Sequence, residues 1–265
     1  MRKWLSKGRP VAADDESVTA QHEATDPVAH PDPARPHPTA APAPAPAASR
    51  RAARARAGRR GVQLVVGLVL YAASIALLVH TGLGNMPWDV LSQGVARQVG
   101  WSLGTVTIVL SVLILLAWWP LRQKPGIGTV ANVVLIGVLI DPFLALLDRL
   151  PELPLAARVG MVLAGIALNG VASALYIGAR LGPGPRDGLM TGLVARTGWP
   201  VGPVRIAIEV TVVAVGWLLG GTLGFATLAY ALGIGPLIHW LLPRLTVPVP
   251  PAVAAVEPAE PGEGR

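Results

Sequence analysis

Apolar residues in this chain fall into six long runs, separated by short segments rich in glycine, proline and polar residues. The runs cover about residues 62–80, 103–120, 126–147, 159–179, 203–220 and 223–242. A helix needs about 20 mostly apolar residues to cross a hydrocarbon core of ~30 Å. The pattern therefore predicts an all-α membrane protein with about six transmembrane helices. The second run is short and the sixth contains Pro236, so these two spans are the least regular.

The chain also contains an internal repeat. Residues 83–140 align without a gap with residues 181–238, at a constant offset of 98 positions, and 21 of the 58 pairs are identical. The identical pairs include glycine, proline, aspartate and tryptophan, which apolar composition alone would not align. A repeat of this length exceeds the roughly 20–50 residues of a solenoid unit and indicates a duplicated domain half.

The repeat predicts a particular membrane topology. Each half, residues 61–150 and 151–242, contains three apolar runs. Because three is odd, the second half must enter the membrane from the opposite side. The prediction is a 3+3 inverted repeat, an architecture typical of transporters, and it depends on the count of three runs in each half.

Composition supports the membrane assignment and excludes several kinds of chemistry. The chain is 52% hydrophobic and only 14% charged, which is unlike a soluble domain of 265 residues. It has no cysteine, so disulfides, thiolate metal sites and cysteine nucleophiles are excluded. The histidines show no HExxH spacing. We therefore expect no metal, no cofactor and no enzymatic activity.

Positive charge is concentrated before the first apolar run. Residues 1–60 contain 11 of the 22 lysines and arginines, and six arginines fall between Arg50 and Arg60. Next to a membrane span, such a stretch indicates a cytoplasmic end and contact with anionic lipid head groups, and not nucleic acid. The Ala- and Pro-rich residues before it lack apolar periodicity, so we expect a disordered tail over 1–60 and another over 243–265. Both termini are expected to be cytoplasmic.

Each half has a long linker between its first and second runs. Residues 82–104 and 180–202 share the pattern L-G-x-x-P-x-D-x-L-x-x-G, followed by G-W-x-x-G. Proline with aspartate two residues later is a helix start, because Asp89 and Asp187 then lie at the positive end of the helix dipole. The linkers therefore predict short helices over about 87–98 and 185–196.

Two positions are open for these short helices. They can lie flat at opposite membrane interfaces, or they can re-enter the membrane and direct their N-termini toward a central polar site. We favour the interfacial position, because Arg97, Arg186 and Arg196 would be costly at depth.

These motifs identify a family resemblance. The paired G-x-P-x-D-x-L and G-W-x-x-G patterns, and "PGIGT" at 125–129, resemble the YczE/YyaS/YitT-type family of bacterial integral membrane proteins. The resemblance covers about 61–242 and implies a multi-pass protein of the bacterial plasma membrane, without implying a substrate or catalytic residue. The second half departs from the pattern, with Arg186 in place of Trp88 and "LGFAT" in place of "PGIGT".

Charged residues within the runs are candidates for a pathway. Arg205 and Glu209 are four residues apart, the spacing of a helical ion pair, and their repeat equivalents are Thr107 and Ser111. The same helix face is therefore polar in both halves. The pair either neutralises itself near the interface or lines a pathway, in which case Glu209 is the better proton carrier.

Two further pairs of repeat equivalents are polar. Asp141 and His239 come late in the third and sixth runs, where Asp141 suggests a helix break and His239 an interface. If they face inward, they could carry a proton or cation. Asn132 and Tyr230 could supply hydrogen bonds to a substrate.

Small residues recur every four positions in the fourth run, at Gly170, Ala174 and Gly178. This spacing allows another helix to approach closely, so we expect packing and not ligand binding. Such faces are also compatible with a homodimer.

The sequence leads to a transporter-like protein for a small polar solute or ion, with its site between the two halves. The alternative is a membrane scaffold or assembly factor that does not transport. A dry interior, with Arg205, Glu209 and Asp141 paired or at interfaces, would favour that alternative.

Overall fold

The computed structural model describes residues 47–248, with side chains from residue 51 onward. This range forms eight α-helices and no strand. The helices are α1 (Ala47–Thr81), α2 (Pro87–Val99), α3 (Leu103–Trp118), α4 (Ile127–Leu147), α5 (Leu155–Gly178), α6 (Pro185–Thr197), α7 (Val201–Leu218) and α8 (Phe225–Leu245). The all-α prediction is confirmed for these residues. The segments 1–46 and 249–265, expected to be disordered, lie outside them.

Five helices are long and apolar enough to cross a membrane: α1, α4, α5, α7 and α8. The remaining predicted span, 103–120, is α3, which has only 16 residues. Together with α2 it passes the same test, but the two helices are bent by 114° at a short break. Residues 47–248 therefore contain five candidate spans, or six if this bent pair counts as one.

The first helix is longer than the sequence predicted. It begins at Ala47 and includes the arginine-rich stretch that we assigned to the tail. Arg51, Arg54, Arg56 and Arg59 are exposed along it. Arg60, the last arginine of the stretch, contacts the neighbouring helices: its Nε donates a hydrogen bond of 2.6 Å to the Ala179 carbonyl.

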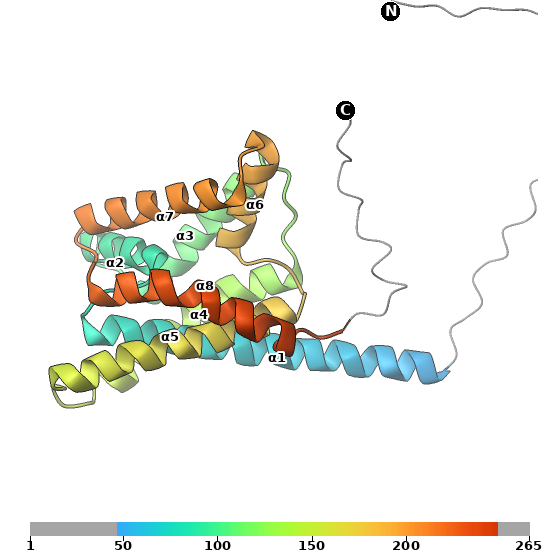
Figure 1. The fold of residues 1–265 in the computed structure, drawn as a ribbon, viewed down its shortest axis with the longest axis horizontal. Helices are drawn as coiled ribbons and strands as arrows, with labels where there is room; N and C mark the ends of the chain where they lie inside the picture. Colours follow the sequence, from blue (N-terminus) through green and yellow to red (C-terminus); the bar gives the residue numbers. More distant parts are fainter. Residues whose placement is uncertain (1–46, 249–265) are drawn as a thin grey trace, which may run out of the picture. The chain divides into compact units, whose positions relative to one another are not determined.

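The core forms where α1 packs along α5, with α4 against α1 and α8 against α5 (Figure 1). Leu68, Ala72 and Val162 are fully buried at its centre. The predicted small-residue stripe lies in this region. A Cβ at Gly170 would come within 2.2 Å of Leu237 on α8. The stripe therefore serves helix packing at Gly170, as its spacing indicated.

The short helices α2 and α6 begin at the prolines that the motif predicted, and each ends at a left-handed glycine, Gly100 or Gly198. Their first turns are buried: Pro87, Asp89 and Pro185 lie inside the bundle. Their last turns are exposed. This differs from helices that lie flat on the surface of the bundle, while their position relative to the membrane stays a prediction. The N-terminal turns lie among the helices, as in the re-entrant alternative.

The arginines explain this difference. Arg97 and Arg196 lie at the exposed C-terminal ends of α2 and α6, where they donate to carbonyl groups at Gly220 and Pro120. Only Arg186 enters the bundle, and it is paired with Asp89. The cost of burying charge therefore falls on one neutralised pair.

Each short helix packs against a long helix from the other half of the chain. Helix α2 lies against α7, where a Cβ at Gly94 would be 2.3 Å from the Gly216 carbonyl oxygen. Helix α6 lies against α3, where Gly188 lies beneath the buried ring of Trp118. The indole Nε1 of Trp118 also donates to the Pro185 carbonyl at 3.0 Å. The two halves are thus interlocked.

The loops before the short helices cross in the same way. The Leu83 carbonyl accepts from Ala226 N at the start of α8 (3.0 Å), and the Leu181 carbonyl accepts from Gly128 N at the start of α4 (2.7 Å). The glycines that follow, Gly84 and Gly182, have positive φ values of 122° and 130°. Any side chain there would be strained and would also approach the opposite helix start.

Helix boundaries follow the sequence offset of 98 residues. Helices α2 and α6 begin at Pro87 and Pro185, and α4 and α8 begin at Ile127 and Phe225. The paired sequence patterns therefore correspond to paired helices.

The close approach of α2 and α7 gives a stability prediction. We expect Gly94→Ala to destabilise the protein by about 1–3 kcal/mol, because a new methyl group would overlap the Gly216 carbonyl. The matched control is Gly160→Ala on α5, where the added Cβ would meet no atom within 4 Å. The control should be neutral or stabilising by up to ~1 kcal/mol. Thermal unfolding in detergent checks both, and equal stability of the two variants would contradict the packing described.

Candidate functional site

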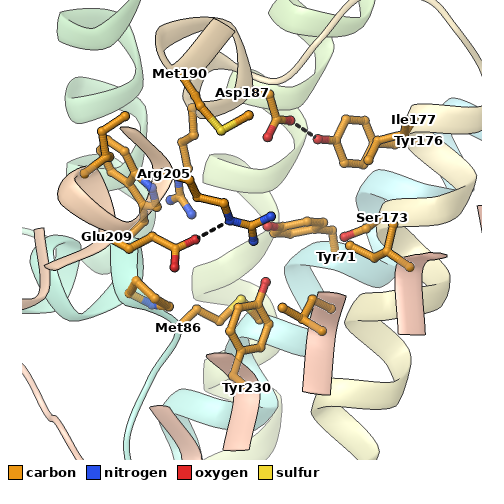
Figure 2. Close-up of a pocket in the computed structure, with 16 residues that line it drawn as sticks. Tyr71, Met86, Ser173, Tyr176, Ile177, Asp187, Met190, Arg205, Glu209 and Tyr230 are labelled. Atoms are coloured by element: carbon orange, nitrogen blue, oxygen red, sulfur yellow. Dashed lines mark hydrogen bonds and ion pairs between the residues drawn. The ribbon is translucent and has the colours of Figure 1, made fainter. Parts of the chain in front are cut away.

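A central cavity of about 230 Å³ lies among α1, α5 and α8, the first turns of α2 and α6, and the inner face of α7 (Figure 2). Its polar lining comes from Tyr71, Ser173, Tyr176, Arg186, Asp187, Arg205, Glu209 and Tyr230. Four of the residues predicted from sequence are therefore brought together here: Asp187, Arg205, Glu209 and Tyr230.

Asp187 is held at the inner end of the cavity. It lies in the first turn of α6, and its Oδ2 accepts a hydrogen bond from the Tyr176 hydroxyl of α5. The Tyr176 ring meets the Tyr71 ring edge-on, with centroids 6.1 Å apart. One carboxylate and two tyrosines thus form a polar and aromatic wall (Figure 2).

Arg205 and Glu209 face each other on α7. Nε of Arg205 lies 2.9 Å from Glu209 Oε1, so the ion pair expected from their spacing forms. Their side chains are 51% and 32% exposed, compared with 23% for Arg186. The pair marks the open side of the cavity.

The floor of the cavity is a buried hydrogen-bond network. The Tyr230 hydroxyl donates to Asn169 Oδ1 at 3.0 Å, and Asn169 Nδ2 donates to Ser74 Oγ at 2.9 Å. Asn169 is fully buried. These bonds fix the orientation of Tyr230 toward the cavity.

Arg186 and Asp89 form the most buried ion pair in the described residues. Arg186 Nη2 lies 3.2 Å from Asp89 Oδ1, with side chains 23% and 2% exposed. The guanidinium also stacks on Trp88, 5.3 Å from the ring centroid. The second carboxylate oxygen of Asp89 is buried without a hydrogen-bond partner. Residues 88 and 186 are repeat equivalents, so the departure from the repeat creates this interaction.

A second, smaller cavity of about 20 Å³ lies on the other side of Arg186. Thr107, Ser111 and Asn132 line it from α3 and α4, and Tyr71 and Arg186 line both cavities. The Thr107 hydroxyl is buried without a partner. Asn132, predicted as a hydrogen-bonding residue, therefore lies in this cavity and not with Tyr230.

Asp141 and His239 do not line either cavity. Asp141 Oδ1 accepts from Gly104 N at 3.0 Å, so it caps the first turn of α3. His239 is exposed on α8. The structure does not support the inward-facing alternative for these two residues. The Asp141 carboxylate is bonded to the backbone amide of Gly104, and the His239 side chain is exposed.

The sequence did not indicate Tyr71, Tyr176 and Asn169. Tyrosine and asparagine in apolar helices carry no charge, and a single sequence gives no sign of the face on which they lie. The repeat offered one signal, because Tyr71 and Asn169 are 98 residues apart and both are polar. Within the described range, no group of three His, Asp or Glu residues could hold a metal ion.

A family model matches residues 58–243, which includes every helix of both halves apart from the first turns of α1 and the last residues of α8. The chain belongs to the family of unknown function DUF6198. It is an integral membrane protein with several apolar helices. No solved structure matches it.

Known relatives agree with this family assignment. The chain is 37% identical over 184 residues to an uncharacterized protein of Haemophilus influenzae and 34% identical to the uncharacterized membrane protein YczE of Bacillus subtilis. Each match covers 67% of this chain and 83% of the relative. The protein YyaS of Bacillus subtilis is 23% identical over 180 residues, covering 67% of this chain and 90% of that protein. The resemblance found from the motifs is thus confirmed.

The buried ion pair gives a second prediction. Arg186→Met should destabilise the protein by about 3–5 kcal/mol, because it leaves the Asp89 carboxylate buried without a charge partner. The double variant Asp89→Asn with Arg186→Met should recover much of this loss, since no buried charge then remains. Thermal unfolding of single and double variants in detergent checks this coupling. Additive losses would show that the two groups do not interact.

Proposed function

We propose that this protein transports a small polar solute across the bacterial plasma membrane, with its site in the central cavity between two inverted halves. The N-terminal Arg-rich stretch and the C-terminus then lie on the cytoplasmic side, and the exposed arginines of α1 meet anionic lipid head groups.

The interlocked helices support the inverted arrangement. Helix α2 packs on α7 and α6 packs on α3, and the two crossing loops bond to the starts of α8 and α4. Each contact has a counterpart at an offset of 98 residues in both partners. A pseudo-two-fold axis between the halves accounts for such reciprocal contacts, and with three spans in each half this axis would lie in the membrane plane.

The observation that carries the proposal is that the two cavities are lined by equivalent positions. Arg205, Glu209 and Tyr230 line the large cavity, and the residues 98 positions earlier, Thr107, Ser111 and Asn132, line the small one. The same pairing relates Trp88 to Arg186. One central site with two symmetry-related entrances, one wide and one narrow, is the arrangement that alternating access requires.

The cavity chemistry favours a solute with polar groups of both signs. The lining contains two guanidinium groups, from Arg186 and Arg205, and two carboxylates, from Asp187 and Glu209. A third carboxylate, that of Asp89, pairs with Arg186. The N-termini of α2 and α6 add partial positive charge beside two of these carboxylates. The site is thus close to neutral. Its volume of about 230 Å³ equals roughly eight water molecules at ~30 Å³ each, enough for a small zwitterion or polar metabolite.

The scaffold alternative retains one supporting observation. Arg205 and Glu209 are paired, and Asp141 caps a helix, as a protein without a pathway would require. The polar cavity between the halves is what this alternative leaves unexplained. A homodimer is compatible with either function, although not through the α5 stripe, because Gly170, Ala174 and Gly178 are buried within the bundle. Neither function involves enzymatic chemistry.

Solute binding gives the third prediction. In liposomes, a panel of small zwitterions, amines, acids and ions should contain a compound that raises the unfolding temperature, and at 100 times Kd the stabilisation is about 2.7 kcal/mol. Asp187→Asn and Glu209→Gln should reduce or abolish this shift, since both carboxylates line the cavity. The matched control is Asp148→Asn, whose carboxylate is 69% exposed and pairs with His80. It should retain the full shift. Absence of any shift across the panel, with all variants as stable as wild type, would favour the scaffold.

A further inference from the structure

The two halves differ in one respect that the repeat does not predict. Helix α3 packs against α4, whereas the equivalent helices α7 and α8 make no comparable contact in the described residues. The large cavity lies between α7 and α8, and the small one between α3 and α4. The difference in cavity size thus follows from an open helix pair in one half and a closed pair in the other.

A pair of glycines shows how close the closed pair is. A Cβ on Gly104 of α3 would be 2.1 Å from the Gly137 carbonyl oxygen of α4, and a Cβ on Gly137 would be 2.2 Å from Ile108 Cγ1. Neither position has room for a side chain. These glycines are required by the contact between α3 and α4.

The same glycines are present in the open half without a contact to require them. Gly202 of α7 and Gly235 of α8 are the equivalents, and a Cβ on either would meet no atom within 4 Å. Ile206, the equivalent of Ile108, is also retained, and its side chain is 63% exposed. In a helix, glycine is less favourable than alanine. A closed α7–α8 contact supplies the packing that would compensate for that cost.

The small cavity has the features of an entrance that is shut. The Thr107 hydroxyl, on a residue only 4% exposed, is buried there without a hydrogen-bond partner. Arg186 and Tyr71 separate this cavity from the large one and line both. A buried hydroxyl without a hydrogen-bond partner is destabilising, and water or a solute would remove this cost when the cavity opens.

Resting on the transport proposed above, we infer that the small cavity lined by Thr107, Ser111 and Asn132 is the second entrance to the central site. It opens as α3 separates from α4, while α7 closes onto α8 through Gly202 and Gly235. Solute passes between the two cavities beside Arg186. The structure is then the state in which the α7–α8 entrance is open.

The chain contains no cysteine, so cysteine pairs can test this motion directly. The test pair is Ile206→Cys with Gly235→Cys, the equivalents of Ile108 and Gly137, whose atoms touch in the closed half. Under an oxidant in native membranes we expect this pair to lose its free thiols and form a disulfide, since closure brings the two Cβ atoms within bonding range.

The matched control is Val210→Cys with Leu232→Cys on the same two helices. Their equivalents, Val112 and Val134, remain 44% and 49% exposed in the closed half, so closure should not join them. No disulfide in the test pair, although both cysteines react with a small thiol reagent and the protein is folded, would overturn the inference. So would equal crosslinking of test pair and control.

A second measurement tests the entrance itself. A membrane-impermeant maleimide should label Ile208→Cys, in the large cavity, from one side of the membrane and Ser111→Cys, in the small cavity, from the other. The disulfide between positions 206 and 235 should increase labelling at position 111. Labelling of both from the same side, or no effect of the disulfide, would overturn the inference. Neither experiment uses a solute, so the two proposals can fail separately. If the helices close as inferred but no compound of the panel binds, that result counts against the transport proposal alone.

Discussion

The rest of the structure depends on how a buried arginine is neutralised. Arg186 extends from the first turn of α6 to Asp89 in the first turn of α2, and Trp88 stacks on its guanidinium. The pair joins the two halves at the point where both short helices enter the bundle. If either charge were removed alone, the other would remain buried without a partner, and an isolated charge in a low-dielectric interior is far more costly than a paired one.

The starts of α2 and α6 explain why the centre of the protein contains a polar cavity. Since α2 and α6 begin inside the bundle, their free amide groups and the side chains of Asp89 and Asp187 lie among the apolar helices. The long helices pack around these polar ends and cannot close completely upon them. The cavity is thus a consequence of two interrupted segments meeting, and its polar lining combines these helix starts with polar side chains of the long helices.

The sequence predicted much of this arrangement because the repeat is so informative. The all-α class, the helix starts at Pro87 and Pro185 and the pairing of Arg205 with Glu209 follow from spacing alone. The position of α2 and α6 did not follow, because the cost of Arg186 at depth could be judged only with its partner known. Asp89 is 97 residues away in sequence, and nothing local links the two.

The cavity residues divide in the same way. Asp187 and Tyr230 could be found, since each has a polar equivalent in the other half. Tyr176 could not, because its equivalent is Leu78 and its hydroxyl becomes meaningful only beside Asp187. For Asp141 the sequence suggested a proton or cation site, because a carboxylate in an apolar helix is unusual. The structure shows that this carboxylate instead accepts a hydrogen bond from the amide of Gly104.

The packing of Trp118 on Gly188 has a consequence for the history of the duplication. At the reciprocal contact the sizes are exchanged, with Gly216 in place of the tryptophan and Val90 in place of the glycine. A chain built from two copies of the first half would place valine at position 188, where even a Cβ would be 1.9 Å from the Trp118 ring. The two halves are complementary at these contacts, so the first half could not make the same contact with a copy of itself. The tryptophan of one half and the glycine of the other thus fit only as unlike partners.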